Sequence, residues 1–166
     1  MQTIVVGVDG SDGAAVALRW AVAEGAIRGW PVEAVLAWGF LDQHHKIVAE
    51  DFDPGYSADD AKEALDTYVE QAIGAESAGS VERRIVSNLP ARALVDASSD
   101  AALLVVGARG LGGFRGLLLG SVSQKCLHEA TCPVAVIRPD EVGAPPPGPP
   151  HARPRPSPSP WTAGRC

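Results

Sequence analysis

The segment ALLVVGARGLGGFRGLLLGSVSQ, residues 102–124, joins an almost unbroken apolar run to six glycines and then to the start of an expected helix. An apolar run without alternation is typical of a strand whose two faces are both buried, as in a parallel sheet. Glycine is costly in ordered backbone, and one reason to cluster it is a main chain that must come very close to a ligand. The segment therefore indicates both a fold class and a candidate binding loop.

Four other segments also read as strands. They are TIVVGVD (3–9), PVEAVLAW (31–38), SVERRIV (80–86) and PVAVIR (133–138). The first of these is nearly continuous in apolar residues, like ALLVVGA at 102–108. We therefore expect both of these strands in the middle of a sheet that is covered on its two faces.

Segments rich in alanine, leucine and charge separate the strands and predict helices. These segments are 12–29, 57–77, 90–100 and 121–131. Their start signals are Ser11 as a candidate N-cap, Pro90 in a first turn, and Ser121 with Gln124 in a capping-box pattern. The order β-α-β-α-β-α-β-α-β predicts an α/β fold, a five-stranded parallel doubly wound sheet with helices on both faces.

Composition limits the class of protein. The chain has 166 residues, 46% of them hydrophobic and 20% charged, which suits one soluble domain. The formal net charge of -6 argues against a nucleic-acid partner, and no apolar run is long enough to predict a membrane span. Three cysteines and an N-terminal sequence without a signal-peptide pattern favour a cytoplasmic location.

The end of the chain differs sharply from the rest. Ten of the fourteen prolines lie in the last 28 residues. Such a segment has few ways to bury apolar surface or to donate backbone hydrogen bonds. We therefore predict a domain over residues 1–139 and a Pro-rich, disordered tail over 140–166.

The candidate site follows from the fold. In open α/β sheets, ligands bind beyond the carboxyl ends of the strands where the strand order reverses, here the ends of the first and fourth strands. Asp9 follows the first strand, and Gly107, Arg109 and Gly110 follow or end the fourth. The helix that starts near Ser121 would present unpaired N–H groups that suit a phosphate.

Two better-known nucleotide motifs are absent. No Gly-Lys pair occurs in the chain, so there is no P-loop, and Arg115 stands where the pattern G-x-G-x-x-G would need its third glycine after Gly110 and Gly112. A flexible connector remains an alternative reading of the glycine-rich segment. Asp9 could likewise be a turn residue that helps Ser11 to cap the first helix, a role that is compatible with ligand binding.

The pattern G-x2-G-x9-G-[ST] is complete at Gly107, Gly110, Gly120 and Ser121. With VGVDGS near the start and HEATCPVAVIRP near the end of the expected domain, the chain resembles the universal stress proteins, in their ATP-binding branch. The resemblance covers residues 2–139. It implies a Rossmann-like fold related to the adenine nucleotide alpha hydrolases.

The resemblance also implies a ligand and its contacts. The ligand would be ATP, which similar proteins often bind with a divalent ion such as Mg²⁺ or Mn²⁺, with Asp9 as the one nearby carboxylate and no assigned metal ligand. Adenosine would lie near Val8, Asp9 and Trp38. The expected pocket as a whole comprises Val8, Asp9, Trp38, Val106, Gly107, Arg109, Gly110, Gly120, Ser121, Val122 and Ser123.

Three functions stay open at this stage. The first is a nucleotide-dependent regulatory or stress-adaptation protein that holds ATP without catalysis. The second is a slow ATP hydrolase or phosphotransferase, which would need a water-orienting group that the sequence does not supply beside the loop. The third is a binding module for another adenine nucleotide.

The last strand gives an expectation about assembly. PVAVIR at 133–138 is apolar and is expected at a sheet edge, which is prone to pair with another chain. The family resemblance also implies dimers formed by this strand. We therefore expect a homodimer through residues 134–138.

Overall fold

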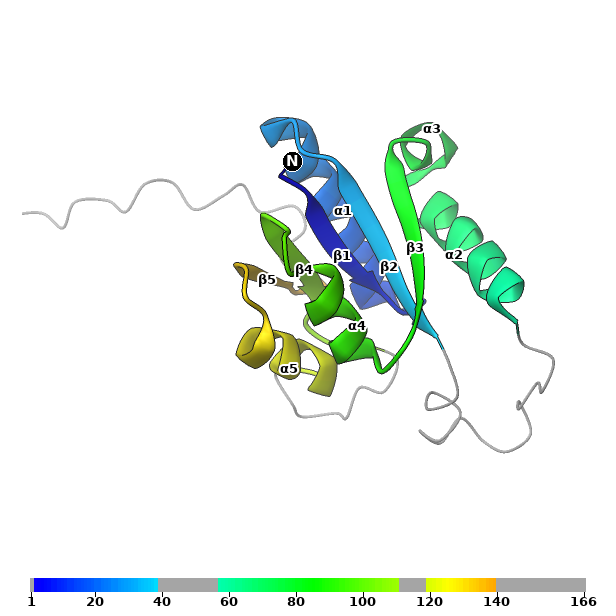
Figure 1. Cartoon of the computed structure of the whole chain (residues 1–166). Coiled ribbons are helices and arrows are strands. Elements are labelled where there is room, and N and C mark those ends of the chain that lie inside the picture. The colour runs from blue at the N-terminus through cyan, green and yellow to red at the C-terminus, as the bar shows by residue number, and fades with distance from the viewer. Residues whose placement is uncertain (1, 39–56, 111–118, 140–166) are drawn as a thin grey trace, which may run out of the picture.

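Five parallel strands form the central layer of the molecule, in the order β3-β2-β1-β4-β5 (Figure 1). The computed structural model describes residues 2–38, 57–110 and 119–139. Its strands are β1 (Ile4–Val8), β2 (Val32–Trp38), β3 (Val81–Ser87), β4 (Leu103–Gly107) and β5 (Val134–Ile137). Its helices are α1 (Asp12–Arg28), α2 (Ala58–Ile73), α3 (Ala75–Ala78), α4 (Pro90–Ala97) and α5 (Ser121–Glu129).

The predicted parallel, doubly wound α/β fold is confirmed. All four neighbouring pairs of strands run parallel. β1 pairs with β2 on one side and with β4 on the other, so the strand order reverses between β1 and β4. The carboxyl ends of these two strands therefore meet at the crevice where such folds bind ligands.

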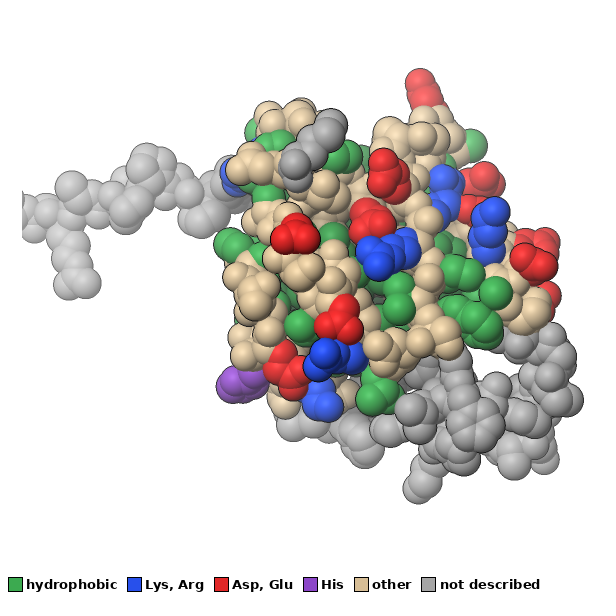
Figure 2. Space-filling model, in the orientation of Figure 1, with side chains coloured by type: hydrophobic (Ala, Val, Ile, Leu, Met, Phe, Trp, Pro, Cys, Tyr) green, Lys and Arg blue, Asp and Glu red, His purple; other side chains and the backbone are tan. Residues whose placement is uncertain are grey.

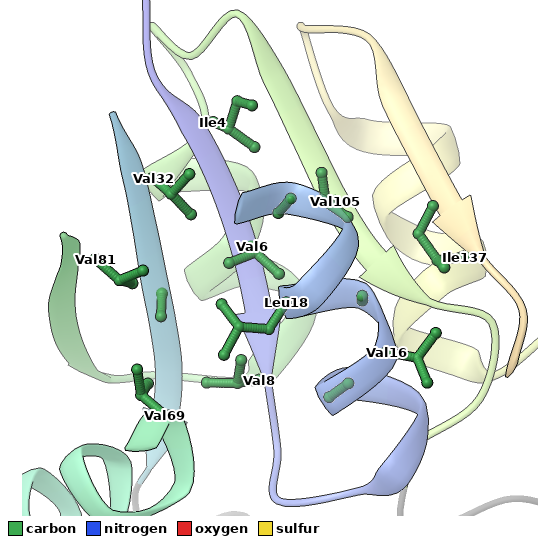
Figure 3. Packing of buried hydrophobic residues seen from close by; sticks show 14 of the residues in the cluster. Ile4, Val6, Val8, Val16, Leu18, Val32, Val69, Val81, Val105 and Ile137 are labelled. Carbon is green, nitrogen blue, oxygen red and sulfur yellow. The ribbon is translucent and has the colours of Figure 1, made fainter. Parts of the chain in front are cut away.

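Helices cover both faces of the sheet and divide the core into two clusters. Figure 3 shows the first cluster, in which Leu18 of α1 packs over Val6 and Val8 of β1, with Val69 of α2 beside them. The second cluster lies on the opposite face, where Leu94 of α4 and Cys126 of α5 are buried against the sheet. This two-sided burial is the reason why β1 and β4 are almost continuously apolar.

Two of the predicted helix starts are correct and one is wrong. The hydroxyl of Ser11 accepts a hydrogen bond from the N–H of Ala14 and caps α1, and Pro90 is in the first turn of α4. Ser121, however, is already the first helical residue of α5, whose N-cap is Gly120. The expected capping box of Ser121 with Gln124 therefore does not form.

The helix expected over 57–77 is in fact two helices. Ser57 and Asp60 form a capping box at the start of α2 that the sequence reading did not single out. Gly74 adopts φ of 80°, which ends α2, and α3 follows as a single turn. A side chain at Gly74 would be strained in this left-handed backbone.

The two edges of the sheet differ in chemistry. β3 carries charged side chains along its edge. Nε of Arg83 lies 2.8 Å from Oδ1 of Asp66 in α2, and Nη1 of Arg84 lies 3.9 Å from Oε2 of Glu33 in β2. β5, at the other edge, consists of Val134, Ala135, Val136 and Ile137. Charged residues protect an edge from pairing with another strand, so only the β3 edge has this protection.

Candidate functional site

The turn between β1 and α1 forms one wall of the crevice. The backbone N–H and the hydroxyl of Ser11 both donate to Oδ1 of Asp9, at 3.0 and 2.6 Å. Between them, Gly10 adopts φ of 84°, a conformation that favours glycine. Asp9 therefore has the turn role considered above, and this role fixes one oxygen of an exposed carboxylate at the end of β1.

The loop that leaves β4 lies directly against this turn. A Cβ atom built on Gly110 would collide with Oδ2 of Asp9. Asp9 thus has Oδ1 held by Ser11 and Oδ2 facing the main chain of Gly110. The structure brings together the strand-end aspartate and the second glycine of the sequence motif, which lie 101 positions apart in the chain.

Gly107 has an internal reason to be glycine. A Cβ atom on it would lie 2.9 Å from the carbonyl carbon and oxygen of Gly13, in the first turn of α1. Gly13 in turn allows the backbone of α1 to lie close to the carbonyl oxygen of Arg109, because a Cβ atom at Gly13 would collide with that oxygen. The glycines at 107 and 110 were expected to let the backbone approach a phosphate chain; close packing against backbone accounts for Gly107, whereas a Cβ atom at Gly110 would meet only the carboxylate of Asp9.

Gly120 is different, because the described protein leaves room there. A Cβ atom would be 3.6 Å from the nearest described atom, the carbonyl oxygen of Ala108, which is ordinary van der Waals contact. Its φ and ψ of -74° and 162° are open to any residue. Among the described residues, no side chain caps α5.

The start of α5 is anchored beside the end of β4. The N–H of Gly120 donates to the carbonyl of Ala108 at 2.8 Å. The hydroxyl of Ser123, which is buried, donates to the carbonyl of Gly107 at 2.7 Å. Because its hydroxyl already holds α5 against β4, Ser123 would contact a phosphate through its backbone N–H group.

The first turn of α5 combines exposure with the positive end of a helix dipole. Ser121 is exposed and Val122 is partly buried against the α5 side of the core. The N–H groups of Ser121, Val122 and Ser123 precede the first helical hydrogen bond of α5, in which the N–H of Gln124 donates to Gly120. Such N–H groups have no acceptor within the helix and can bind an anion.

The remaining predicted residues surround this centre unevenly. The side chains of Val8 and Val106 are buried in the two core clusters on opposite faces of the sheet. Only the main chain of these two residues therefore faces the crevice. Trp38 is the last residue of β2, at the same carboxyl edge, and is partly buried. Arg109 is exposed beside Gly110, and the rest of the glycine-rich loop, 111–118, lies outside the described residues.

Sequence reasoning missed Tyr68 of α2. Its hydroxyl donates to the backbone carbonyl of Ser11 at 2.7 Å, across 57 positions of sequence. Burial, and then the nearby negative charge of Asp9, raise the pKa of Tyr68 well above its ordinary value. The helical stripe of Leu65, Tyr68 and Val69 predicts packing, but nothing in it identifies Ser11 as the partner.

The described part of the chain contains neither a cluster of metal-ligating side chains nor a helix that could span a membrane. No group of three or more His, Cys, Asp or Glu side chains gathers there as a metal site would require. Cys126 is buried in the core, as expected from its place on the apolar face of α5. None of the described helices has the length and apolar character to cross a bilayer.

The fold and the crevice define a class, the doubly wound α/β proteins with a glycine-rich loop and a helix start at the switch point. Residues 1–138 match the model of the universal stress protein family. The chain belongs to the universal stress protein family. The resemblance seen in the sequence is therefore confirmed.

Similar proteins agree with this assignment. A universal stress protein of Mycobacterium tuberculosis is 36% identical over 148 residues, which cover 84% of this chain and 49% of that protein. This chain thus spans about half the length of the curated relatives that it matches. UspA of Lactobacillus plantarum is 26% identical, with a TM-score of 0.65 over 82% of this chain and 97% of UspA.

Two further solved structures contain nucleotides. A universal stress protein in complex with cAMP is 28% identical, with a TM-score of 0.59 over 82% of this chain and 96% of that one. The universal stress protein of Archaeoglobus fulgidus in complex with dAMP is 27% identical, with a TM-score of 0.57 over 82% of this chain and 98% of that one.

Proposed function

We propose that this chain binds ATP at the crevice between β1 and β4 and acts as a nucleotide-dependent regulatory or stress-adaptation protein. The observation that carries the proposal is the start of α5, which no described side chain caps. The N–H groups of Ser121, Val122 and Ser123 have no acceptor within α5, and this positive helix end lies beside the carboxyl end of β4. A phosphate chain supplies the negative oxygens that such a helix start favours.

Support for an adenine nucleotide comes from the relatives. The two family members described above were solved with cAMP and with dAMP. The choice of ATP among adenine nucleotides rests on the complete G-x2-G-x9-G-[ST] pattern. Another adenine nucleotide is the alternative ligand, and a competition series of ATP, ADP, AMP and cAMP would separate them.

The roles proposed for the residues follow from the geometry. The N–H groups of Ser121, Val122 and Ser123 bind phosphate oxygens, while the exposed Arg109 can reach them from the loop. Asp9, fixed by Ser11, borders the adenosine part together with the main chain of Val8. Val106, Gly107, Gly110 and Trp38 complete the pocket that the family resemblance implies.

A divalent ion would enter with the nucleotide. Mg²⁺ is usually held by phosphate oxygens, waters and one or two carboxylates, and Mn²⁺ suits similar oxygen ligands. Asp9 borders Gly110 and is the carboxylate that we assign to this role. When bound, the ion would neutralise phosphate charge, and we assign it no further ligand.

Binding without catalysis is favoured over hydrolysis. Hydrolysis needs a group that orients the attacking water, and the described atoms nearest to a Cβ position at Gly120 are backbone atoms of Ala108, Arg109 and Gly110. The test is to identify and quantify the nucleotide in protein purified without added ligand, and to follow added ATP with time. Intact, bound ATP supports the proposal, whereas ADP that accumulates over many turnovers favours an ATP hydrolase.

We further propose that two copies pair through the β5 edge. This edge is apolar, while charged side chains protect the β3 edge. Figure 2 shows acidic and basic side chains interspersed over one face of the molecule, without a large patch of a single charge. A dimer in the cytoplasm would be consistent with the cysteine usage and with the relatives that are about twice as long.

A further inference from the structure

Ser11 is the meeting point of three elements of the site. Its N–H and hydroxyl donate to Asp9, its hydroxyl accepts from Ala14, and its carbonyl accepts from Ala15 as α1 begins. The same carbonyl accepts a second hydrogen bond, at 2.7 Å, from the hydroxyl of Tyr68 on α2. One residue therefore joins the aspartate of the site to a helix that contributes no predicted ligand contact.

Described side chains do not pack against the middle of this turn. Gly10, between Asp9 and Ser11, has no described atom within 4 Å of the position where a Cβ would stand. Its left-handed backbone is one that glycine enters and leaves easily. The two hydrogen bonds from Ser11 therefore help to orient the Asp9 carboxylate, whereas packing at Gly10 does not.

The Tyr68 hydroxyl is well suited to restrain Ser11. Tyr68 is partly buried and its ring packs against the core cluster that contains Leu18 and Val69. In addition, the guanidinium of Arg19 on α1 donates to the carbonyl of Ala72 on α2 at 3.2 Å, so α1 and α2 are joined one turn further along. α2 therefore offers a fixed point from which the hydroxyl reaches the turn.

We propose that Tyr68 is a positioning residue for nucleotide selectivity: its hydroxyl holds Ser11, and Ser11 holds Asp9 in the orientation that recognises the adenosine part of the ligand. This inference rests on the proposed function. It predicts that Tyr68 acts on adenosine recognition and leaves the phosphate contacts at α5 unchanged. Phosphate binding is independent because α5 is anchored by Gly107 and Ala108 of the β4 end.

The test compares Tyr68→Phe with the parent in calorimetric titrations of ATP and of inorganic tripolyphosphate. Phe keeps the buried ring, and Ser11 keeps its bond from Ala15, so the fold should persist. Loss of one neutral hydrogen bond should weaken ATP binding about two- to tenfold and tripolyphosphate binding less than about twofold. Unchanged ATP affinity, or equal loss for both ligands, would overturn the inference.

Two further variants separate positioning from a general loss of stability. Ser98→Ala is the matched control, because Ser98 is buried at the end of α4 and donates its hydroxyl to the carbonyl of Val95. It should leave both affinities unchanged. In an Asp9→Ala background, Tyr68→Phe should weaken ATP binding no further, and an additive loss would show that Tyr68 acts independently of Asp9.

A measurement without ligand keeps this inference separate from the proposed function. Hydrogen exchange at the Ser11 amide, which donates to Asp9, should accelerate about two- to tenfold in Tyr68→Phe and remain unchanged in Ser98→Ala. If the parent binds no ATP, the proposed function fails, and the exchange rate still decides whether Tyr68 holds the turn. An unchanged rate would refute the positioning role.

Discussion

Gly13 in the first turn of α1 lies so close to the loop after β4 that a Cβ atom on it would be 2.5 Å from the carbonyl oxygen of Arg109. Gly107, at the end of β4, has the same relation to the backbone of Gly13. Because backbone atoms cannot move aside as a flexible side chain can, these two glycines set the separation between α1 and β4. The width of the crevice depends on that separation.

We expect Gly107→Ala to destabilise the protein. The added methyl group would lie 2.9 Å from two backbone atoms of Gly13, so α1 must shift, at a cost of about 1 to 3 kcal/mol in unfolding free energy. Chemical denaturation measures the change. The matched control is Gly79→Ala, with φ of -61° and no described atom within 4 Å, which should be neutral or slightly stabilising. Equal stability of both variants would contradict this packing role.

We expect Gly120→Asp to separate stability from binding. The backbone of Gly120 already has N-cap geometry with room for a Cβ atom, and aspartate is a good N-cap, so unfolding free energy should rise by a few tenths of a kcal/mol. The added carboxylate would occupy the proposed phosphate position and repel ATP. Thermal melting and calorimetric titration measure the two effects.

Gly120→Ser is the control for that experiment, because it adds a cap without a charge. It should weaken ATP binding less than Gly120→Asp does. The corresponding change at Gly110 would be harder to interpret, since a side chain there meets Asp9 within the protein. If Gly120→Asp bound ATP as tightly as the parent, the phosphates would have to lie elsewhere.

We expect a homodimer that depends on the open edge of β5. The carbonyls of Pro133 and Ile137 accept from β4, so by alternation the N–H and carbonyl groups of Val134 and Val136 point away from it. Val136→Pro removes one outward N–H and should shift the protein to monomer. Mass measurement at about 10 to 50 µM tests this moderate affinity. Arg84→Ala, at the β3 edge, should remain dimeric, and a monomeric parent would refute the dimer.

We expect Cys126 to resist alkylation until the protein unfolds. Burial, with smaller contributions from Glu129 and Cys132, raises the pKa of Cys126 to about 11. The reactive thiolate is therefore scarce at neutral pH, whereas the partly exposed Cys132 should react first. Mass spectrometry of alkylated peptides measures the order. Rapid labelling of Cys126 in the folded protein would contradict its burial.

The same pKa shift predicts a dependence of stability on pH. The folded state disfavours the Cys126 thiolate, so this contribution to stability is complete below the unfolded pKa of about 9 and is lost as pH rises toward 11. Unfolding free energy should fall over this window in the parent and less steeply in Cys126→Ala. Tyr68, whose pKa is also raised, adds to the slope above pH 10 in both proteins.

The fold could be predicted from sequence because its strongest signals are local and repeated. The apolar runs at β1 and β4 identify central strands, and the alternation with helices leaves few topologies. The sequence predicts the start of α5 one residue late, because Ser121 matches a cap pattern, whereas the structure uses Gly120, whose N–H donates to the carbonyl of Ala108. A cap pattern cannot report that distant partner.

The site was predictable in its position but not in its internal contacts. Asp9 and Gly110 were selected as the ends of neighbouring strands, and they do meet. The sequence could not distinguish a glycine required by packing, such as Gly107, from one with free space, such as Gly120. Nor could it find the bond from Tyr68 to Ser11, because a partner 57 positions away leaves no periodic signal.

The absence of a cap on α5 from any described side chain also affects the behaviour of the helix itself. With Gly120 in the cap position, two bonds from described residues hold the first turn around Ser121 and Val122, from Gly120 to Ala108 and from Ser123 to Gly107. That turn should fray more readily than the rest of the nine-residue helix. An anion that took the place of the cap would suppress fraying, and by mass action the melting temperature of the whole protein would rise with ligand concentration.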